Sequence, residues 1–401
     1  MISEEEFLAQ AKKRYQAIAK LSNIKSYYDY EKTFDQIWTD YGREVLERSI
    51  SEPSKDRRKK NLSRYGKIEI NNTHPFSEKV NGFKISPYMQ DKMIYIGQND
   101  CYGDGHEVLS NLLGVSVNAM QLYRVTDFYG GLLEQEKVLE VDAVEPDILK
   151  VDNQECIYAM VDGSMLFTRE EAWKEVKLGR IFKQSSCMDI SNKRGWIRHS
   201  LYEAYLGKAD KFTDRMDRYL GCYRSIDKRL IFVGDGARWI WKWVDQHYPF
   251  ATQILDWYHA LEHLHDFAKV CLSNQESYNS WVGQQEQLLK NSQVNQVIEN
   301  IKNLELTKQN QRKQQSQLIT YYTENRSRMD YQQYQNTGAG IIGSGAIEAA
   351  NREVVQKRMK LSGQRWSKIG AQNMLTLRTT KLSDKWNKVV NLICTEKNKA
   401  A

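Results

Sequence analysis

The chain has 401 residues, 41% of them hydrophobic, so it is long enough for two or three domains with apolar cores and is not a disordered protein. No apolar stretch approaches the about 20 residues of a membrane span. The six cysteines never form a CxxC pair, which argues against a zinc ribbon and a disulfide scaffold, and the net charge of +7 identifies no partner by itself.

The first residues, MISEEEFLAQAKKRYQ, lack the basic start and apolar core of a signal peptide, so we expect a cytoplasmic protein with no membrane partner. Residues 1–50 are expected to form two helices, and residues 71–100 to be irregular. A basic run at 55–67, KDRRKKNLSRYGK, leads into a short strand, KIEIN. Basic runs are often solvated faces, but here we favour contacts with DNA phosphates. The residues expected to make them are Arg57, Arg58, Lys59 and Lys60.

Residues 106–130, HEVLSNLLGVSVNAMQLYRVTDFYG, predict a helix-turn-helix. Apolar patterns on either side of a glycine indicate two helices and a tight turn. The second helix carries Asn118, Gln121 and Arg124, where a recognition helix reads bases. Any compact helical pair gives a similar pattern, so plain packing is the alternative. We interpret residues 1–150 as a mainly helical DNA-binding region.

From about residue 155 strands and helices alternate, which predicts an α/β layer with parallel strand pairing. Strands are expected within 157–166, 173–190, 229–234 and 251–256, and helices at 197–223, 237–248 and directly after 256. Ligands bind such sheets at the carboxyl ends of the strands, where Asp162, Asp235 and Asp256 fall.

Residues 272–335 are polar and rich in Gln, Asn and Lys. Spaced apolar side chains favour an inserted helical bundle there, and a low-complexity segment is the alternative. We therefore expect the core to begin at 151–271, to be interrupted by this insertion, and to be completed by 336–401, which also supplies C-terminal helices.

Three carboxylates carry the predicted chemistry. Asp162 and Asp235 each end an apolar run, and Glu348 lies just inside a helix that follows a glycine turn. Three converging acids repel one another by about 4 kcal/mol per pair at ~4 Å and an effective dielectric of ~20. A divalent cation removes that penalty, which predicts a site for two ions of Mg²⁺ or Mn²⁺. Such a site performs in-line attack on a phosphodiester without a protein nucleophile.

Taken singly, each aspartate could be a turn residue, and Glu348 a first-turn acid at a helix N-terminus. An RNase H-like fold takes its first acid from the first strand, its second from a later strand and its last from a helix packed on the sheet. The order and settings of the three acids fit that fold. The sequence thus predicts an α/β RNase H-like catalytic core with an α-helical insertion, preceded by the mainly helical N-terminal region.

The segment 255–267, LDWYHALEHLHDF, holds three of the seven histidines. His259 and His263 share a helix face, a spacing that can bind zinc, but the HExxH order is absent. A zinc hydrolase and histidines that are simply satisfied within the helix remain alternatives. We favour a supporting role for Asp256 and His259, which would orient the acid site by hydrogen bonding.

A second basic run, VVQKRMKLSGQRWSK at 354–368, directly follows the glutamate. Its position beside the carboxylates favours contacts with DNA phosphates. The residues expected to make them are Lys357, Arg358, Lys360 and Arg365.

Four strings make the chain similar to bacterial insertion-sequence transposases of the DDE type, in particular to the Kra-type family and its Mutator-like relatives. They are VDGSMLFTREEAWKEVKLG, GDGARWIWKWV, FATQILDWYHALEHL and GSGAIEAANREVVQKRMKLSGQRWS. The resemblance implies that Asp162, Asp235 and Glu348 bind metal, and that Asp256 and His259 match the family's C/D-x-x-H signature. Many members also carry an N-terminal zinc module with paired cysteines, which this sequence lacks, so recognition of the element's ends would rest on residues 1–150.

We therefore expect a transposase that cleaves DNA at terminal inverted repeats and joins it to target DNA. We also expect a homo-oligomer on double-stranded DNA, located at the nucleoid. Two alternatives are an RNase H-like nuclease that cuts without joining, and a DNA-binding regulator, such as a domesticated transposase without catalysis.

Overall fold

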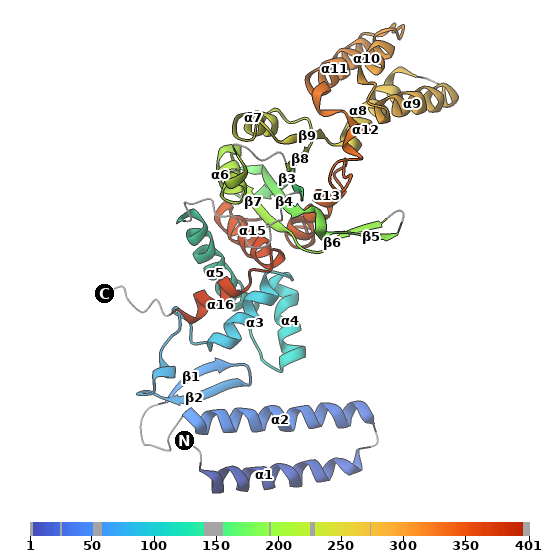
Figure 1. Ribbon diagram of the computed structural model, residues 1–401. Coiled ribbons are helices and arrows are strands. Elements are labelled where there is room, and N and C mark those ends of the chain that lie inside the picture. The colour runs from blue at the N-terminus through green and yellow to red at the C-terminus, as the bar shows by residue number, and fades with distance from the viewer. Residues whose placement is uncertain are drawn as a thin grey trace. The chain divides into compact units, whose positions relative to one another are not determined.

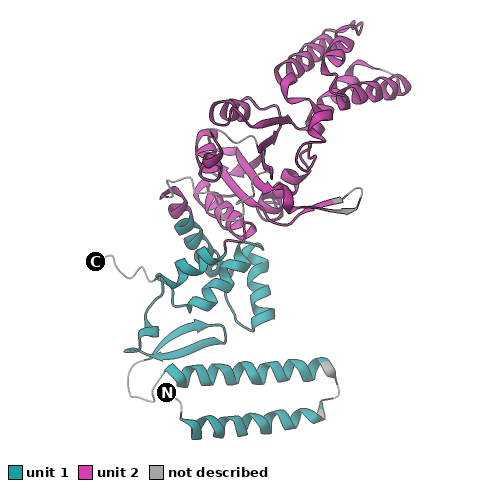
Figure 2. Cartoon of the chain, in the orientation of Figure 1, with its two compact units in different colours: residues 1–133, 386–401 teal, residues 134–385 magenta. Residues whose placement is uncertain are grey.

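The computed structural model describes residues 3–24, 26–50, 58–139, 155–191, 194–224, 229–272 and 274–395. The chain forms two compact units, one of Met1–Leu133 with Trp386–Ala401 and one of Glu134–Lys385 (Figure 1; Figure 2). The fold is mixed α/β, with a five-stranded mixed sheet in the second unit. None of the helices in the described ranges has the length and apolar character that crossing a bilayer requires.

The first unit consists of two long helices, a β-hairpin and several shorter helices. Its main elements are α1 (Glu4–Ala19), α2 (Tyr27–Ile50), β1 (Arg58–Ser63), β2 (Gly66–Asn71), α3 (Pro87–Gly97), α4 (Tyr102–Leu113), α5 (Ala119–Leu139, which extends into the second unit) and α16 (Asn387–Cys394). The two helices predicted for residues 1–50 are present. A capping box begins α1, because the Ser3 and Glu6 side chains each accept a hydrogen bond from the other residue's backbone N–H.

Helix α3 corrects the expectation that residues 71–100 are irregular. Ser86 caps its first turn, and Pro87 occupies the first helical position, where a missing N–H has no consequence. The helix is held in place because Met89, Met93 and Ile94 are buried. A Ser-Pro pair before apolar residues at helical spacing is a start signal that our interpretation overlooked.

The sheet of the second unit has the strand order β7-β4-β3-β8-β9. Its strands are β3 (Ile157–Thr168), β4 (Ala172–Lys183), β7 (Leu201–Leu206), β8 (Leu230–Gly234) and β9 (Thr252–Leu255). β4 is antiparallel to both β3 and β7, whereas β8 is parallel to both β3 and β9. A separate two-stranded ribbon is formed by β5 (Cys187–Ser191) and β6 (Arg194–Ile197).

Helices cover both faces of this sheet. One face packs on α6 (Ala209–Leu220) and α7 (Arg238–His247) through a core that includes Ala159, Phe212 and Val244. Helix α13 (Gly345–Asn351) is anchored where the buried Arg180 of β4 donates to the Ala346 carbonyl at 2.8 Å. Helix α15 (Lys368–Leu382) packs on β7. Because β3 is buried on both faces, it begins with a continuous apolar run rather than an alternating one.

The segment 272–335 is helical, as its spaced apolar residues predict. After β9 the chain forms α8 (Trp257–Cys271), α9 (Gln275–Lys290), α10 (Val294–Lys302), α11 (Gln309–Asn325) and α12 (Tyr331–Tyr334). Figure 1 shows α9, α10 and α11 as a group at one end of the second unit. The hydroxyl of Tyr322 joins α11 to α8 by donating to the Ala260 carbonyl at 2.8 Å.

The helix expected over 197–223 is only partly present. Strand β7 occupies the first part of this range, and α6 begins after it at Ala209. β7 is hard to recognise because its buried Glu203 is charged. That carboxylate is neutralised by Lys137 at 3.0 Å and Arg215 at 3.5 Å, and neither partner is near it in sequence.

Candidate active site

A row of aspartates lies where the parallel pairing of β3, β8 and β9 ends. The register pairs Val161 of β3 with Gly234 of β8, and Gly234 with Leu255 of β9. An acid directly follows each of these three residues: Asp162 follows Val161, Asp235 follows Gly234, and Asp256 follows Leu255. Since parallel strands end at one edge of a sheet, the three aspartates come to the same level of that edge.

Asp162 does not end its strand, which corrects one expectation. β3 continues to Thr168 as a hairpin with β4, well beyond its parallel pairing with β8. Asp162 therefore lies where the parallel pairing stops, and the longer antiparallel hairpin holds its backbone.

The Asp162 carboxylate lies near a second negative charge, that of Asp235. Its Oδ1 accepts from the Gly163 N–H at 2.7 Å, and its Oδ2 accepts from Asn351 Nδ2 at 3.2 Å. Burial raises the pKa of Asp162, these two hydrogen bonds lower it, and the charge of Asp235 raises it. The two carboxylates are thus close enough to repel one another, and a divalent cation would relieve that repulsion.

Asp235 is held by the turn between β8 and α7. Its Oδ1 accepts from the Ala237 N–H at 2.9 Å, and its backbone carbonyl accepts from the Trp241 indole N–H at 2.8 Å. A Cβ on the next residue, Gly236, would collide with the ring of Tyr321. The glycine of this Asp-Gly pair is therefore required by close packing of α11 against the turn.

Asp256 caps helix α8 and is 1% exposed. Its Oδ1 accepts from the backbone N–H groups of Tyr258 at 3.1 Å and Ser344 at 2.9 Å. Its Oδ2 has no hydrogen-bond partner among the described residues and lies 4.0 Å from His259 Nε2. Burial raises the pKa of Asp256, whereas the Ser344 hydrogen bonds and the charge of His259 lower it. A buried carboxylate oxygen without a partner is suited to a cation, a protonated histidine or a water.

Glu348 is not part of the aspartate row. It lies in the first turn of α13, is exposed, and accepts a hydrogen bond from the Ser344 hydroxyl. Within the described ranges, which contain all the predicted acids, no three His, Cys, Asp or Glu side chains are arranged to hold a metal ion. The register therefore places Asp162 and Asp235 on neighbouring strands, and Glu348 is connected to Asp256 through Ser344.

Tyr321 and His263 belong to the same edge, and sequence reasoning missed the tyrosine. Their rings lie 4.2 Å apart between centroids. The Tyr321 hydroxyl is buried and has no hydrogen-bond partner in the described part of the chain. Burial, and then the charges of Asp235 and Asp256, raise the pKa of Tyr321, while burial lowers the pKa of His263. Tyr321 comes from α11, whose polar sequence carries no motif, so only the tertiary structure could identify it.

Two further side chains, Asn351 and Lys360, approach the β3 end of the site from the segment that follows Glu348. Asn351 is the donor to Asp162 described above, and Lys360 Nζ donates to Ser164 Oγ at 2.6 Å. Burial lowers the pKa of Lys360, and the charge of Asp162 raises it. One turn of π-helix, Arg352–Gln356, lies between the two residues, and such turns are frequent at functional sites.

The model of an uncharacterised protein family, UPF0236, matches residues 156–392, which is more than half of the chain. The chain belongs to UPF0236. No curated protein matches it. The UPF0236 match contains all the predicted acids and the segment with the histidines, whereas the first basic run and residues 106–130 lie outside it.

The four residues of the second basic run that are predicted to contact phosphates in this UPF0236 member differ in exposure. The prediction is wrong for Arg358, which is 1% exposed and lies over the Trp366 ring at 5.3 Å, so it cannot reach a phosphate. Lys357, Lys360 and Arg365 are exposed. The Lys357 ammonium pairs with Glu353.

In the first basic run, Arg58, Lys59 and Lys60 are paired with acids. Arg58 lies 4.0 Å and Lys60 lies 3.6 Å from Glu69, and Lys59 lies 2.9 Å from Glu78. Arg57 lies outside the described residues. These pairs reduce the free positive charge that the hairpin offers to DNA.

Residues 106–130 fall on α4, a turn and α5. Gly114 ends α4 with a φ of 62°, a left-handed conformation that favours glycine. Asn118 Oδ1 accepts from the Gln121 N–H at 2.7 Å, so Asn118 caps the first turn of α5. Arg124 is exposed and Gln121 half-buried, which leaves Arg124 the more accessible of the two. The helical pair is present, and its role in reading DNA stays a prediction.

Proposed function

We propose that the protein is a DDE-type transposase with an RNase H-like core, which cleaves DNA at the terminal inverted repeats of an insertion sequence and transfers the strand to target DNA. The aspartate row, which lies where the parallel pairing of β3, β8 and β9 ends, carries the proposal. The order of the acids also supports it, since the first lies on β3, the second follows β8, and the last lies on α13.

The residues proposed to hold Mg²⁺ or Mn²⁺ are Asp162, Asp235 and Glu348. The mutual repulsion of the two aspartates fits a divalent cation, and carboxylate oxygens are the ligands such ions prefer. Glu348 would join them after giving up its hydrogen bond with the Ser344 hydroxyl. When bound, two ions supply the positive charge that makes in-line attack on a phosphodiester possible.

The surrounding side chains position these acids. Asn351 and the Gly163 N–H fix the Asp162 carboxylate, and the Ala237 N–H fixes that of Asp235. Asp256 supports the site by holding α8 and the Ser344 backbone together, and His259 faces its unpartnered oxygen. Fixed orientations of this kind reduce the reorganisation needed during the reaction.

Double-stranded DNA is the proposed partner, and the protein would act as a homo-oligomer on DNA ends within the nucleoid. In the second unit Lys357, Lys360 and Arg365 would contact phosphates. The predicted contacts in the N-terminal region are Arg57, Arg58, Lys59, Lys60, Asn118, Gln121 and Arg124.

One observation favours a second candidate, a DNA-binding regulator without catalysis. Glu348 is exposed and accepts a hydrogen bond from the Ser344 hydroxyl, and among the described residues no three His, Cys, Asp or Glu side chains are arranged to hold a metal ion. A protein that had lost catalysis would have no need of such an arrangement.

Cleavage and strand transfer on DNA carrying the flanking ends, with Mg²⁺ or Mn²⁺, separate these candidates. We expect the wild type to produce joined strands and Asp235→Asn to lose both cleavage and joining while retaining DNA binding. Cleavage without joined product would indicate a nuclease. Binding without metal-dependent cleavage by the wild type would indicate the regulator.

A further inference from the structure

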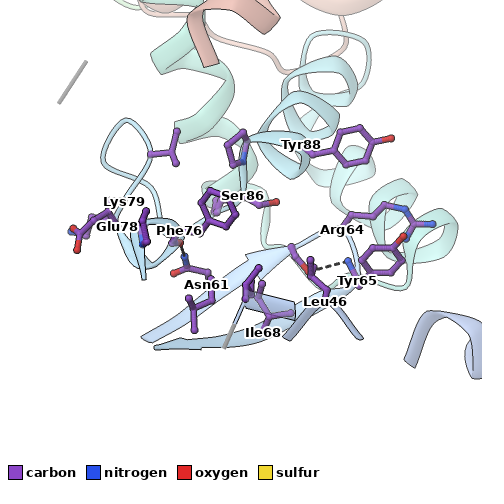
Figure 3. A pocket seen from close by; sticks show the side chains of 17 residues that line it. Leu46, Asn61, Arg64, Tyr65, Ile68, Phe76, Glu78, Lys79, Ser86 and Tyr88 are labelled. Carbon is purple, nitrogen blue, oxygen red and sulfur yellow. Dashed lines mark hydrogen bonds between the residues drawn. The ribbon is translucent and has the colours of Figure 1, made fainter. Parts of the chain in front are cut away.

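A cavity of about 470 Å³ lies within the first unit, between the end of α2, the β1–β2 hairpin and the segment 75–88 (Figure 3). Its wall is mainly apolar and includes Leu46, Ile68 and Ile85. A cavity of this size can hold a flat, drug-sized ligand or a single nucleotide.

Two polar atoms of residues that line this cavity are buried and lack a hydrogen-bond partner in the described ranges. Asn61 is 6% exposed, and its Nδ2 donates to the Phe76 carbonyl at 2.9 Å, but its Oδ1 accepts from nothing described. Arg64 NH1 is likewise buried without a described acceptor. Since buried polar groups are normally hydrogen-bonded, a ligand that donates to Asn61 and accepts from Arg64 would satisfy both.

The exposed part of the lining holds aromatic side chains, a lysine and Glu78, whose charge is paired with Lys59 at 2.9 Å. Phe76 is 65% and Tyr88 is 59% exposed, and the Arg64 guanidinium lies over the Tyr65 ring at 5.3 Å. Exposed Lys79 adds a second positive charge to the lining. Aromatic faces beside cations are typical of sites that bind single-stranded nucleic acid, because bases stack on the rings and phosphates pair with the cations.

We propose that this cavity binds an unstacked nucleotide of a DNA strand. The base lies against the apolar wall and donates a hydrogen bond from its Watson–Crick edge to Asn61 Oδ1. Its phosphate pairs with Arg64 or Lys79, and Phe76 or Tyr88 stacks on a neighbouring base. The assignment of the strand as DNA rests on the proposed function.

Two other occupants fit the cavity less well. A purely apolar ligand, such as an acyl chain, would leave both Asn61 Oδ1 and Arg64 NH1 unpaired. An intact duplex keeps its bases stacked, so it cannot place one in the cavity unless that base is extruded. The cavity therefore favours a single strand or a frayed DNA end over a closed duplex.

The test measures the affinity of the full-length protein for fluorescent oligothymidylate, a blunt duplex of the same length, and thymidine monophosphate. We expect Phe76→Ala to weaken oligothymidylate binding by roughly 10-fold, through loss of stacking. Asn61→Leu, which keeps the side-chain size and removes the acceptor, should weaken it by roughly 5-fold or more. Tyr15→Ala removes another exposed aromatic side chain, which lies on α1 and outside the cavity, and should bind like the wild type.

The outcomes separate this proposal from the proposed function. Unchanged oligothymidylate affinity in both cavity variants would overturn the nucleotide site, whatever the cleavage assay shows. Binding of thymidine monophosphate as tight as that of the oligonucleotide would overturn its assignment to a DNA strand. Weakened binding in both variants, with normal binding by Asp235→Asn, would support the cavity even if the wild type cleaved no DNA.

Discussion

The carboxyl edge of the sheet and the β1–β2 hairpin both contain several charged side chains. They differ in whether these charges are paired. At the hairpin, each of the three cations on β1, which are Arg58, Lys59 and Lys60, lies within 4.0 Å of an acid. At the sheet edge two carboxylates repel one another, and a buried oxygen of Asp256 has no partner among the described residues. Paired charges are explained by the fold alone, whereas a buried carboxylate oxygen without a partner is suited to a cation, a protonated histidine or a water. The sheet edge is therefore a stronger candidate for a ligand site than the hairpin, although the hairpin carries the densest run of charge.

The largest expected effect is on catalysis at the sheet edge. Asp162→Asn should lower the rate of strand cleavage by roughly 1,000-fold, because the two remaining carboxylates, Asp235 and Glu348, would hold the divalent cations less tightly and out of position. Glu348→Gln should cause a loss of similar size if Glu348 joins the aspartates in the working site. Cleavage rates of the two variants on the same DNA test this. Full activity in Glu348→Gln would show that the aspartates act without it.

Arg358 offers a sharper contrast between a structural cation and its exposed neighbour. Arg358→Ala should lower the free energy of unfolding by about 3 kcal/mol, because it removes a buried side chain that packs on Trp366. Lys357→Ala should change it by less than about 0.5 kcal/mol, since Lys357 is 56% exposed. Denaturant unfolding measures both, and equal effects would contradict the burial of Arg358.

Some residues of the site can be predicted from the sequence, and others cannot. Short apolar runs located β8 and β9, and an acid directly after each run is a local signal, so Asp235 and Asp256 could be placed in advance. The sequence predicts a strand end at Asp162 because nothing in that apolar run shows that β4 extends the hairpin. It predicts a phosphate contact for Arg358 because a basic run does not reveal which of its side chains is buried.

Tyr321 is the clearest example of a site residue that the sequence alone does not predict. It reaches Asp235 only because α11 packs on the turn at Gly236, a contact between segments far apart in sequence. A polar helix without a motif gives no local indication of such a contact. The same is true of Asn351, whose bond to Asp162 depends on the packing of α13 against the sheet.

A smaller effect is expected in the pH dependence of stability. The pKa of Asp162 is raised above its ordinary value of 3.8, so the folded state holds this proton more tightly than the unfolded chain does. Stability is therefore lost as the pH rises from about 3.8 through the folded pKa. Without metal, Asp162→Asn should therefore be more stable than the wild type at neutral pH. This difference should vanish at lower pH. Thermal unfolding of both proteins across pH measures it, and a less stable variant at neutral pH would contradict the repulsion.

The smallest effect concerns DNA affinity. Arg365→Gln should reduce the slope of log affinity against log salt by about one unit, as expected for one lost phosphate contact. Lys60→Gln should reduce it less, because Lys60 lies 3.6 Å from Glu69 and shares its charge with that acid. Salt titrations of duplex binding compare the two. A larger change in Lys60→Gln would reverse the proposed contrast.

Binding of Mn²⁺ to the metal-free protein tests the central claim most directly. Calorimetry on the wild type, Asp235→Asn and Asp245→Asn isolates the sheet edge, because Asp245 is an exposed aspartate that pairs with Arg328 at 3.2 Å instead. The account predicts Mn²⁺ binding by the wild type and Asp245→Asn, and its loss in Asp235→Asn. Equal binding by all three proteins, or binding by none, would contradict a metal site built on the aspartate row.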